Sequence, residues 1–392
     1  MRDDQNKSDR YDFDAGLDRR GTNCVKWDTI EEGYIPMSIA DMDFGTPAPI
    51  IEAIRRRLDH PAFGYGIRNT EMVDAVIAWF GRTYDFELDR SWIVPLTGIY
   101  SALAFFSSLT DGDVLTATPN YPPILRGPER VDRACVFSPM KKAAETRLAR
   151  YELDFEDLER KAAADVGMYS MCSPHNPIGR VYTKEELERL SDFARKRKLV
   201  VLSDEIHNEL IYDHPHTPYL TVEGGLESSV TLISAGKTCN IPGIPAALAI
   251  VPDEALRGRV IAAASGFGGA GALNTEALRA AYAECDDWKK ALVSYLKENR
   301  DYLETEFLRR FPKIRLTHTE GTYLQWVDFS GYGISNAAQW LLDHPKIVAH
   351  GGKMFGGAES EARINFGCPR SLIKEALDRM ETSLTSSELN AV

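Results

Sequence analysis

Short runs of continuous apolar residues alternate along this chain with longer segments whose apolar residues recur every three or four positions. The apolar runs predict buried strands, at 92–96, 113–117, 134–138, 168–172, 200–203, 230–234 and 247–251. The segments between several of them predict helices, at 98–109, after Tyr121, at 154–163 and at 183–197. Continuous apolar strands separated by helices are typical of a mostly parallel sheet that helices cover on both faces. We therefore predict an α/β fold.

Two flanking regions have a different pattern. Helices are predicted at 47–58 and from Asn69 or Thr70 to about 84, whereas residues 1–46 look irregular and extended. After about Leu256, two helices are predicted at 274–285 and 287–311. They are followed by short strands, at 314–317, 323–328, 346–349 and 362–366, and by helices at 336–342 and from 371. This mixture is typical of a smaller α+β domain. We predict a large domain at 47–285 and a small domain built from 1–46 plus 286–392.

Composition and charge limit the classes of function. The 392 residues carry a net charge of −12, which disfavours a general binder of nucleic acid or anionic membranes, because these need clustered Lys and Arg. No run approaches about 18 apolar residues, so no membrane-spanning helix is expected. The polar start lacks the apolar core of a signal peptide. The six cysteines include no Cys-x-x-Cys pair, which argues against a zinc site or disulfide framework and fits a reducing cytoplasm.

Polar residues near the ends of predicted strands are the candidates for chemistry. In a sheet of this kind the functional crevice lies at the carboxyl ends of the strands, where we expect Asp204, Asn176 and Lys237 to meet. A buried Asp204 needs a cationic partner, because burying a lone charge is costly; an aspartate that only caps the next helix is the alternative. Arg363 interrupts an apolar strand, as arginines that grip a carboxylate do; a structural ion pair is the alternative.

Three further residues complete this set of candidates. A helix opens at Gly98 directly after a strand, and free backbone N–H groups at such a helix start favour a phosphate. Tyr121 offers a ring for stacking, although tyrosines in the core or on the surface are commoner. Tyr65 lies in the predicted loop at 60–66.

In this order and spacing, residues 176–179, 203–207, Lys237 and Arg363 resemble fold-type I enzymes that use pyridoxal 5'-phosphate, over nearly the whole chain. Within the class I/II aminotransferase superfamily, the chain is most similar to the cystalysin-like and cystathionine β-lyase (C–S lyase) branch. That resemblance rests on short matches, at 25–28, 39–44, 172–177, 203–207 and 321–326. It implies an aspartate-aminotransferase-like fold, pyridoxal 5'-phosphate bound to the large domain, and a homodimer with shared active sites.

The resemblance also implies a role for each candidate residue. Lys237 forms the covalent link to the cofactor and later moves the α-proton. Asp204 pairs with the ring nitrogen, and Arg363 grips the substrate α-carboxylate. The remaining roles are contacts with the cofactor: Asn176 with the ring oxygen, His207 in support of it, Tyr121 on the ring face, Gly98, Ile99 and Ser234 with the phosphate, and Tyr65 from the partner subunit.

The branch implies β-elimination of an L-cysteine S-conjugate such as cystathionine, giving thiol, pyruvate and ammonia. An aminotransferase acting on an L-amino acid is the alternative, and a regulatory protein that binds pyridoxal phosphate is a third reading. No second arginine can be assigned from sequence as a clamp for a side-chain carboxylate, and no metal is expected. The chain departs from the branch at Gly236, commonly Ser, and at Cys239, commonly Phe. The glycine-rich segment 266–271 is expected to line the entrance.

Overall fold

A seven-stranded sheet forms the centre of the molecule in the computed structural model, which describes residues 11–64, 66, 69–143, 146–162, 165–266 and 270–389. Its spatial order is β2-β11-β10-β9-β8-β3-β4. The strands are β2 (Ile93–Leu96), β3 (Asp113–Thr118), β4 (Cys135–Pro139), β8 (Val166–Cys172), β9 (Val200–Asp204), β10 (Ser229–Ile233) and β11 (Ala247–Ile250). Among these seven strands, β11 alone runs in the direction opposite to the other six. The prediction of a mostly parallel sheet is confirmed.

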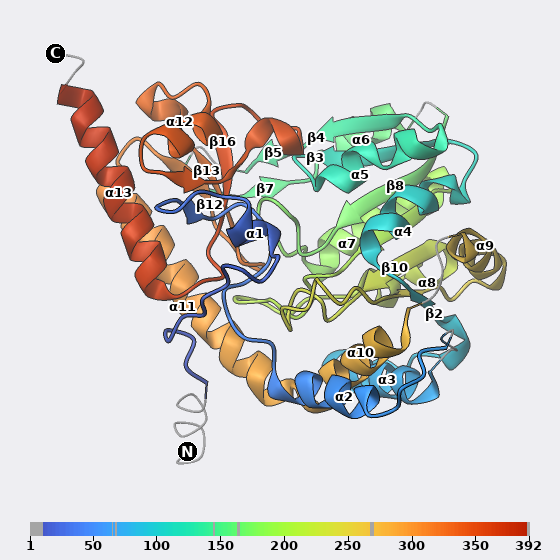
Figure 1. The fold of residues 1–392 in the computed structure, drawn as a ribbon. Helices are drawn as coiled ribbons and strands as arrows, with labels where there is room; N and C mark the ends of the chain where they lie inside the picture. Colours follow the sequence, from blue (N-terminus) through green and yellow to red (C-terminus); the bar gives the residue numbers. More distant parts are fainter. Residues whose placement is uncertain are drawn as a thin grey trace, which may run out of the picture.

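Helices cover both faces of this sheet (Figure 1). Successive side chains of a strand point to opposite faces, and in β9 Val201 and Leu202 accordingly belong to different apolar clusters. Leu202 packs in the cluster of α4 (Ile99–Phe105) and α9 (Glu254–Ser265), and Val201 in that of α6 (Phe155–Lys161) and α7 (Lys184–Arg197). The helices that pack beside β10 and β11 are α2 (Ala48–Leu58), α3 (Thr70–Tyr84) and α10 (Ala272–Glu284). The strands are therefore buried on both sides.

A second sheet of five strands lies beside the first, in the order β15-β16-β13-β12-β6. Its strands are β6 (Leu148–Ala149), β12 (Arg315–Thr317), β13 (Leu324–Asp328), β15 (His350–Gly351) and β16 (Glu361–Asn365). Its helices are α11 (Asp286–Arg310), α12 (Ala337–Asp343) and α13 (Arg370–Leu389). Phe13 and Leu384, from opposite ends of the chain, share one apolar core. In Figure 1 the blue N-terminal segment accordingly lies against the orange and red elements. The exact division into two domains stays a prediction.

Several local predictions were wrong. Residues 1–46 are not wholly irregular, because they contain the short helix α1 (Val25–Asp28) and the strand β1 (Ile35–Pro36), which pairs with β14 (Ile347–Val348). The helix expected at 98–109 is α4 followed by a 3-10 turn at Phe106–Leu109. Helix α9 and strands of two residues, such as β6, were not predicted. A two-residue strand exists only through its partner, so its own sequence carries no periodicity.

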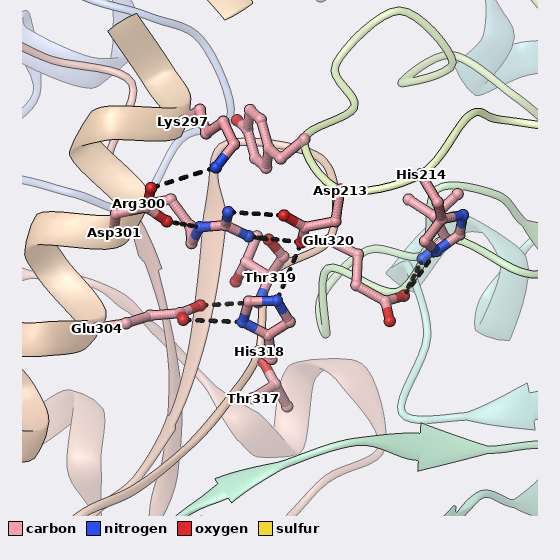
Figure 2. Close-up of polar contacts among 12 residues, drawn as sticks. Asp213, His214, Lys297, Arg300, Asp301, Glu304, Thr317, His318, Thr319 and Glu320 are labelled. Carbon is pink, nitrogen blue, oxygen red and sulfur yellow. Dashed lines mark hydrogen bonds and ion pairs between the residues drawn. The ribbon is translucent and has the colours of Figure 1, made fainter. Parts of the chain in front are cut away.

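A network of charged side chains fastens helix α11 to the loop that follows β9 (Figure 2). The guanidinium of Arg300 donates to both carboxylate oxygens of Asp213, at 2.8 and 2.9 Å, and to the carbonyl oxygen of Thr319 at 2.6 Å. His318 Nδ1 lies 2.9 Å from Glu304 Oε2. Because the same loop begins at the end of β9, these contacts connect the second sheet to the edge where the candidate residues lie. No helix of the described residues is long and apolar enough to cross a membrane.

Candidate active site

A cavity of about 630 Å³ opens at the carboxyl ends of the parallel strands. The chain enters this edge five times, directly after β2, β3, β8, β9 and β10. The cavity is lined by nine of the ten residues selected from sequence, namely Gly98, Ile99, Tyr121, Asn176, Asp204, His207, Ser234, Lys237 and Arg363. Tyr65 lies outside the described residues. These nine residues come from distant parts of the sequence, and the fold gathers them at one edge of the sheet.

Asp204 presents a buried carboxylate oxygen without a partner. Its Oδ1 accepts from the backbone N–H of Ile206 at 3.2 Å, whereas Oδ2 has no hydrogen-bond partner among the described residues. Burial raises the pKa of Asp204 to about 7. β9 is followed by a turn rather than a helix, so the alternative of a helix cap is wrong. Buried polar atoms are normally satisfied, and Oδ2 is therefore positioned for a donor, preferably a cationic one, that enters the cavity.

His207, three residues further along this turn, is also buried, and its Nδ1 has no partner among the described residues. Burial, reinforced by the charges of Lys237 and Arg363, holds the pKa of His207 well below its usual range. The imidazole is therefore neutral at physiological pH. It can accept or donate one hydrogen bond without adding charge to the cavity.

Lys237 extends into the cavity from the turn after β10. Its Nζ donates to the carbonyl oxygen of Ala40, 2.5 Å away. Burial lowers the pKa of Lys237 to about 8, and the neighbouring charge of Arg363 acts in the same direction. A substantial fraction of the amine is therefore neutral near pH 8, which is the form that acts as a nucleophile or base.

The two departures beside this lysine have different consequences. Gly236 lines the cavity, and a Cβ at this position would lie 3.0 Å from Ser234 Oγ. A serine at 236 would therefore require the Ser234 hydroxyl to shift. Cys239 is fully buried in the apolar cluster beside β10, away from the cavity lining, and Cys285 belongs to the same cluster. Having Cys rather than Phe at position 239 thus changes the packing of the apolar core next to the Lys237 turn, and it leaves the cavity wall unchanged.

Arg363 is a buried cation without a carboxylate partner in the described part of the chain. From β16 it donates to Asn176 Oδ1 at 3.0 Å and to the carbonyl oxygen of Ser38 at 2.6 Å, and it lies 4.8 Å from the ring centre of Phe355. Burial lowers the pKa of Arg363 to about 10, which leaves it charged at neutral pH. The structural ion pair considered as an alternative is not formed by any described residue. An anion entering the cavity would thus meet an uncompensated positive charge.

The residues assigned to a phosphate line the cavity near the segment that contains Pro245 and Ala246. Gly98 precedes the first turn of α4, where backbone N–H groups have no partner within the helix. Ser234 Oγ donates to the carbonyl oxygen of Ala246 at 2.7 Å and accepts from Gly236 N at 2.9 Å. The Ser234 hydroxyl would therefore have to leave Ala246 before it could donate to a phosphate. Tyr121 directly precedes the short helix α5 (Pro122–Arg126), and burial raises the pKa of its phenol, so that the ring remains neutral.

Several residues in or beside the cavity wall were missed by reasoning from sequence. Tyr323 donates to the same Ala40 oxygen as Lys237, at 2.9 Å. His350 contacts Arg363, and Arg126 and Arg130 line the cavity beside α5. Residue 323 falls within a matched motif, which was an available signal. The other three carry no local signal, because their part in the site depends on which segments meet in space.

Comparison with known proteins gives a consistent result. The family model of aminotransferase class I and II matches residues 32–380. The cystathionine beta-lyase PatB of Bacillus subtilis (strain 168) is 33% identical over 389 residues, covering 95% of this chain and 100% of that protein. The solved structure of a C–S lyase from Staphylococcus hominis with pyridoxal phosphate bound has a TM-score of 0.90, 29% identity and coverage of 96% and 99%. Cystalysin from Treponema denticola, solved with a pyridoxal 5'-phosphate cofactor, has a TM-score of 0.90, 28% identity and the same coverage.

Proposed function

The chain belongs to the aminotransferase class I and II family, and we propose on that basis that it is a pyridoxal-phosphate-dependent lyase. Its reaction is cleavage of the C–S bond of L-cysteine S-conjugates such as cystathionine, giving thiol, pyruvate and ammonia. One observation carries the proposal. Among the described residues, a carboxylate oxygen without a hydrogen-bond partner, an arginine without a carboxylate partner and a lysine of lowered pKa share one cavity. The relatives named for C–S cleavage support the choice of reaction.

The residues present fit the cofactor. Oδ2 of Asp204 would accept from its protonated ring nitrogen, and Asn176 would contact its ring oxygen. The backbone at Gly98 and Ile99 would bind its phosphate. When bound, pyridoxal phosphate supplies an electron sink for negative charge that develops on the substrate α-carbon.

The chain's own residues provide the rest of the chemistry. Arg363 binds the α-carboxylate and so fixes the amino acid in one orientation. Lys237 removes the α-proton, and its pKa of about 8 makes the neutral base available near working pH. Ala40 O holds Nζ at the cavity edge when the amine is free. The reaction consumes one water and releases thiol, pyruvate and ammonia, so it needs no keto acid as a second substrate.

An aminotransferase is the second candidate, because the matching family includes such enzymes by name. The test is to incubate the purified holoenzyme with L-cystathionine and no keto acid, with pyruvate and thiol measured separately. Sustained release of both, at equal rates, supports the lyase. Turnover that begins only after a keto acid is added contradicts it and favours the aminotransferase. If no amino acid changes the cofactor absorbance, the third reading, a regulatory protein, is favoured. The Lys237→Ala variant serves as the inactive control.

We also propose that the protein forms a homodimer, in which Tyr65 of each subunit reaches the partner's cofactor. Leu58 and Phe63, which precede Tyr65, are 50% and 55% exposed in the single chain, as apolar residues of an interface would be. Sedimentation of the holoenzyme tests the assembly, and a monomer would contradict it. We further propose a cytoplasmic location, since all six cysteines are free thiols.

A further inference from the structure

Arg363 is oriented by three neutral groups. Asn176 Oδ1 and the Ser38 carbonyl oxygen each accept one of its N–H groups, and His350 Nδ1 lies 3.0 Å from Nη2. Arg363 has no acceptor capacity, so the N–H of Nη2 is the donor and Nδ1 of His350 the acceptor. In neutral imidazole the proton then resides on Nε2.

The backbone fixes this contact. His350 of β15 and Arg363 of β16 are paired residues in the antiparallel register. The side chains of directly paired residues lie on the same face of a sheet and are close enough to interact. His350 also lines the cavity, so it stands beside the arginine at the place where a ligand would enter.

We propose that His350 is a positioning residue that orients the Arg363 guanidinium toward the substrate carboxylate without neutralising its charge. The inference rests on the proposed binding of an α-carboxylate by Arg363. A glutamate at position 350 would also orient the guanidinium, but it would pair with it and compete with the substrate. A leucine would remove this acceptor and leave the guanidinium oriented only by Asn176 and Ser38. Only a neutral acceptor provides both orientation and an available charge.

The electrostatics of the site agree with this role. Burial and the adjacent Arg363 charge lower the pKa of His350 to about 4. The imidazole therefore remains neutral, and remains an acceptor through Nδ1, over the whole range in which the enzyme would work.

The test compares His350→Leu, His350→Glu and His350→Gln in the holoenzyme. Butyrate and butyramide, an anion and a neutral molecule of nearly the same shape, serve as probes, and their affinity is read from the rise of the thermal unfolding midpoint with concentration. KM and kcat for L-cystathionine are measured in parallel. His344→Glu, the same substitution at the exposed residue that directly follows helix α12, is the matched control.

We expect His350→Leu to weaken butyrate binding about tenfold, the value of one hydrogen bond to a charged group, and His350→Glu to weaken it further. His350→Gln, which retains a neutral acceptor, should restore most of the affinity. Butyramide binding should be unchanged throughout, and the loss in turnover should appear in KM rather than kcat.

Equal butyrate affinity in all variants would overturn the inference, and so would a parallel loss for butyramide, which indicates a structural role. If His350→Glu does not fold, the comparison of butyrate affinity between His350→Leu and His350→Gln tests the inference in the same way. If butyrate discrimination persists but cystathionine is not cleaved, the role of His350 is supported and the proposed lyase reaction fails.

Discussion

Asp204→Asn should make the cofactor-free protein more stable at alkaline pH. The carboxyl of Asp204 is buried, and its Oδ2 has no partner among the described residues. Its pKa is raised to about 7 in the folded chain, from an ordinary value of 3.8. The folded state therefore retains a proton that the unfolded state has already lost, and the free energy of unfolding falls as pH rises between these two values. Asparagine cannot ionise, so it removes this cost.

The magnitude follows from the two pKa values. One pKa unit corresponds to about 1.4 kcal/mol. The cost of the ionisable side chain is then about 1 kcal/mol at pH 4.5 and about 4 kcal/mol at pH 8, where ionisation in both states is nearly complete. Relative to wild type, the variant should gain about 3 kcal/mol between these two pH values.

The assay is urea unfolding of cofactor-free wild type and variant at pH 4.5 and pH 8, avoiding the isoelectric point near 5.3. Asp111→Asn, the same substitution at an exposed position in a bend, is the control. A stability difference between Asp204→Asn and wild type that is the same at both pH values would refute the reasoning, because Asp204 would then titrate as it does in the unfolded chain. In the presence of cofactor the order should reverse, since wild type alone can pair a carboxylate with the ring nitrogen.

Three further predictions concern neighbouring residues. Lys237→Ala should abolish the absorbance of the covalent cofactor adduct and the retention of cofactor after borohydride reduction; a surviving adduct would place it on another residue. Arg363→Gln should raise KM about 10- to 100-fold, the loss of a charge-assisted bond, with a smaller effect on kcat, and steady-state kinetics with L-cystathionine checks this. In His318, the hydrogen bond to Glu304 raises the pKa. Its stabilisation is therefore fully present below about pH 6.5 and lost as pH rises through the raised value. The stability difference between wild type and His318→Gln in urea should shrink from pH 6 to pH 9, and a growing difference would contradict this sign.

The local sequence allowed most of the central fold to be predicted, because burial on both faces leaves continuous apolar runs. The runs at 200–203 and 230–234, which precede Asp204 and Lys237, were recognised in this way. The direction of β11 was not predictable, since an apolar strand of four residues reads the same in either direction. Helix α9 was missed because small residues leave little amphipathic pattern in its second half.

By itself, then, the sequence determined which residue types stand at the strand ends, and the topology of parallel strands places those ends at one edge. The tertiary structure alone decided how each is partnered. Lys237 meets the carbonyl oxygen of Ala40, which lies 197 positions away, and Arg363 meets the imidazole of His350 rather than an acid. Only the tertiary structure shows that Oδ2 of Asp204 has no hydrogen-bond partner among the described residues. The charge and reactivity of a side chain depend on its burial and on the groups nearest to it in space. Those groups come from segments that are distant in the sequence, and the local sequence does not show which segments will be in contact.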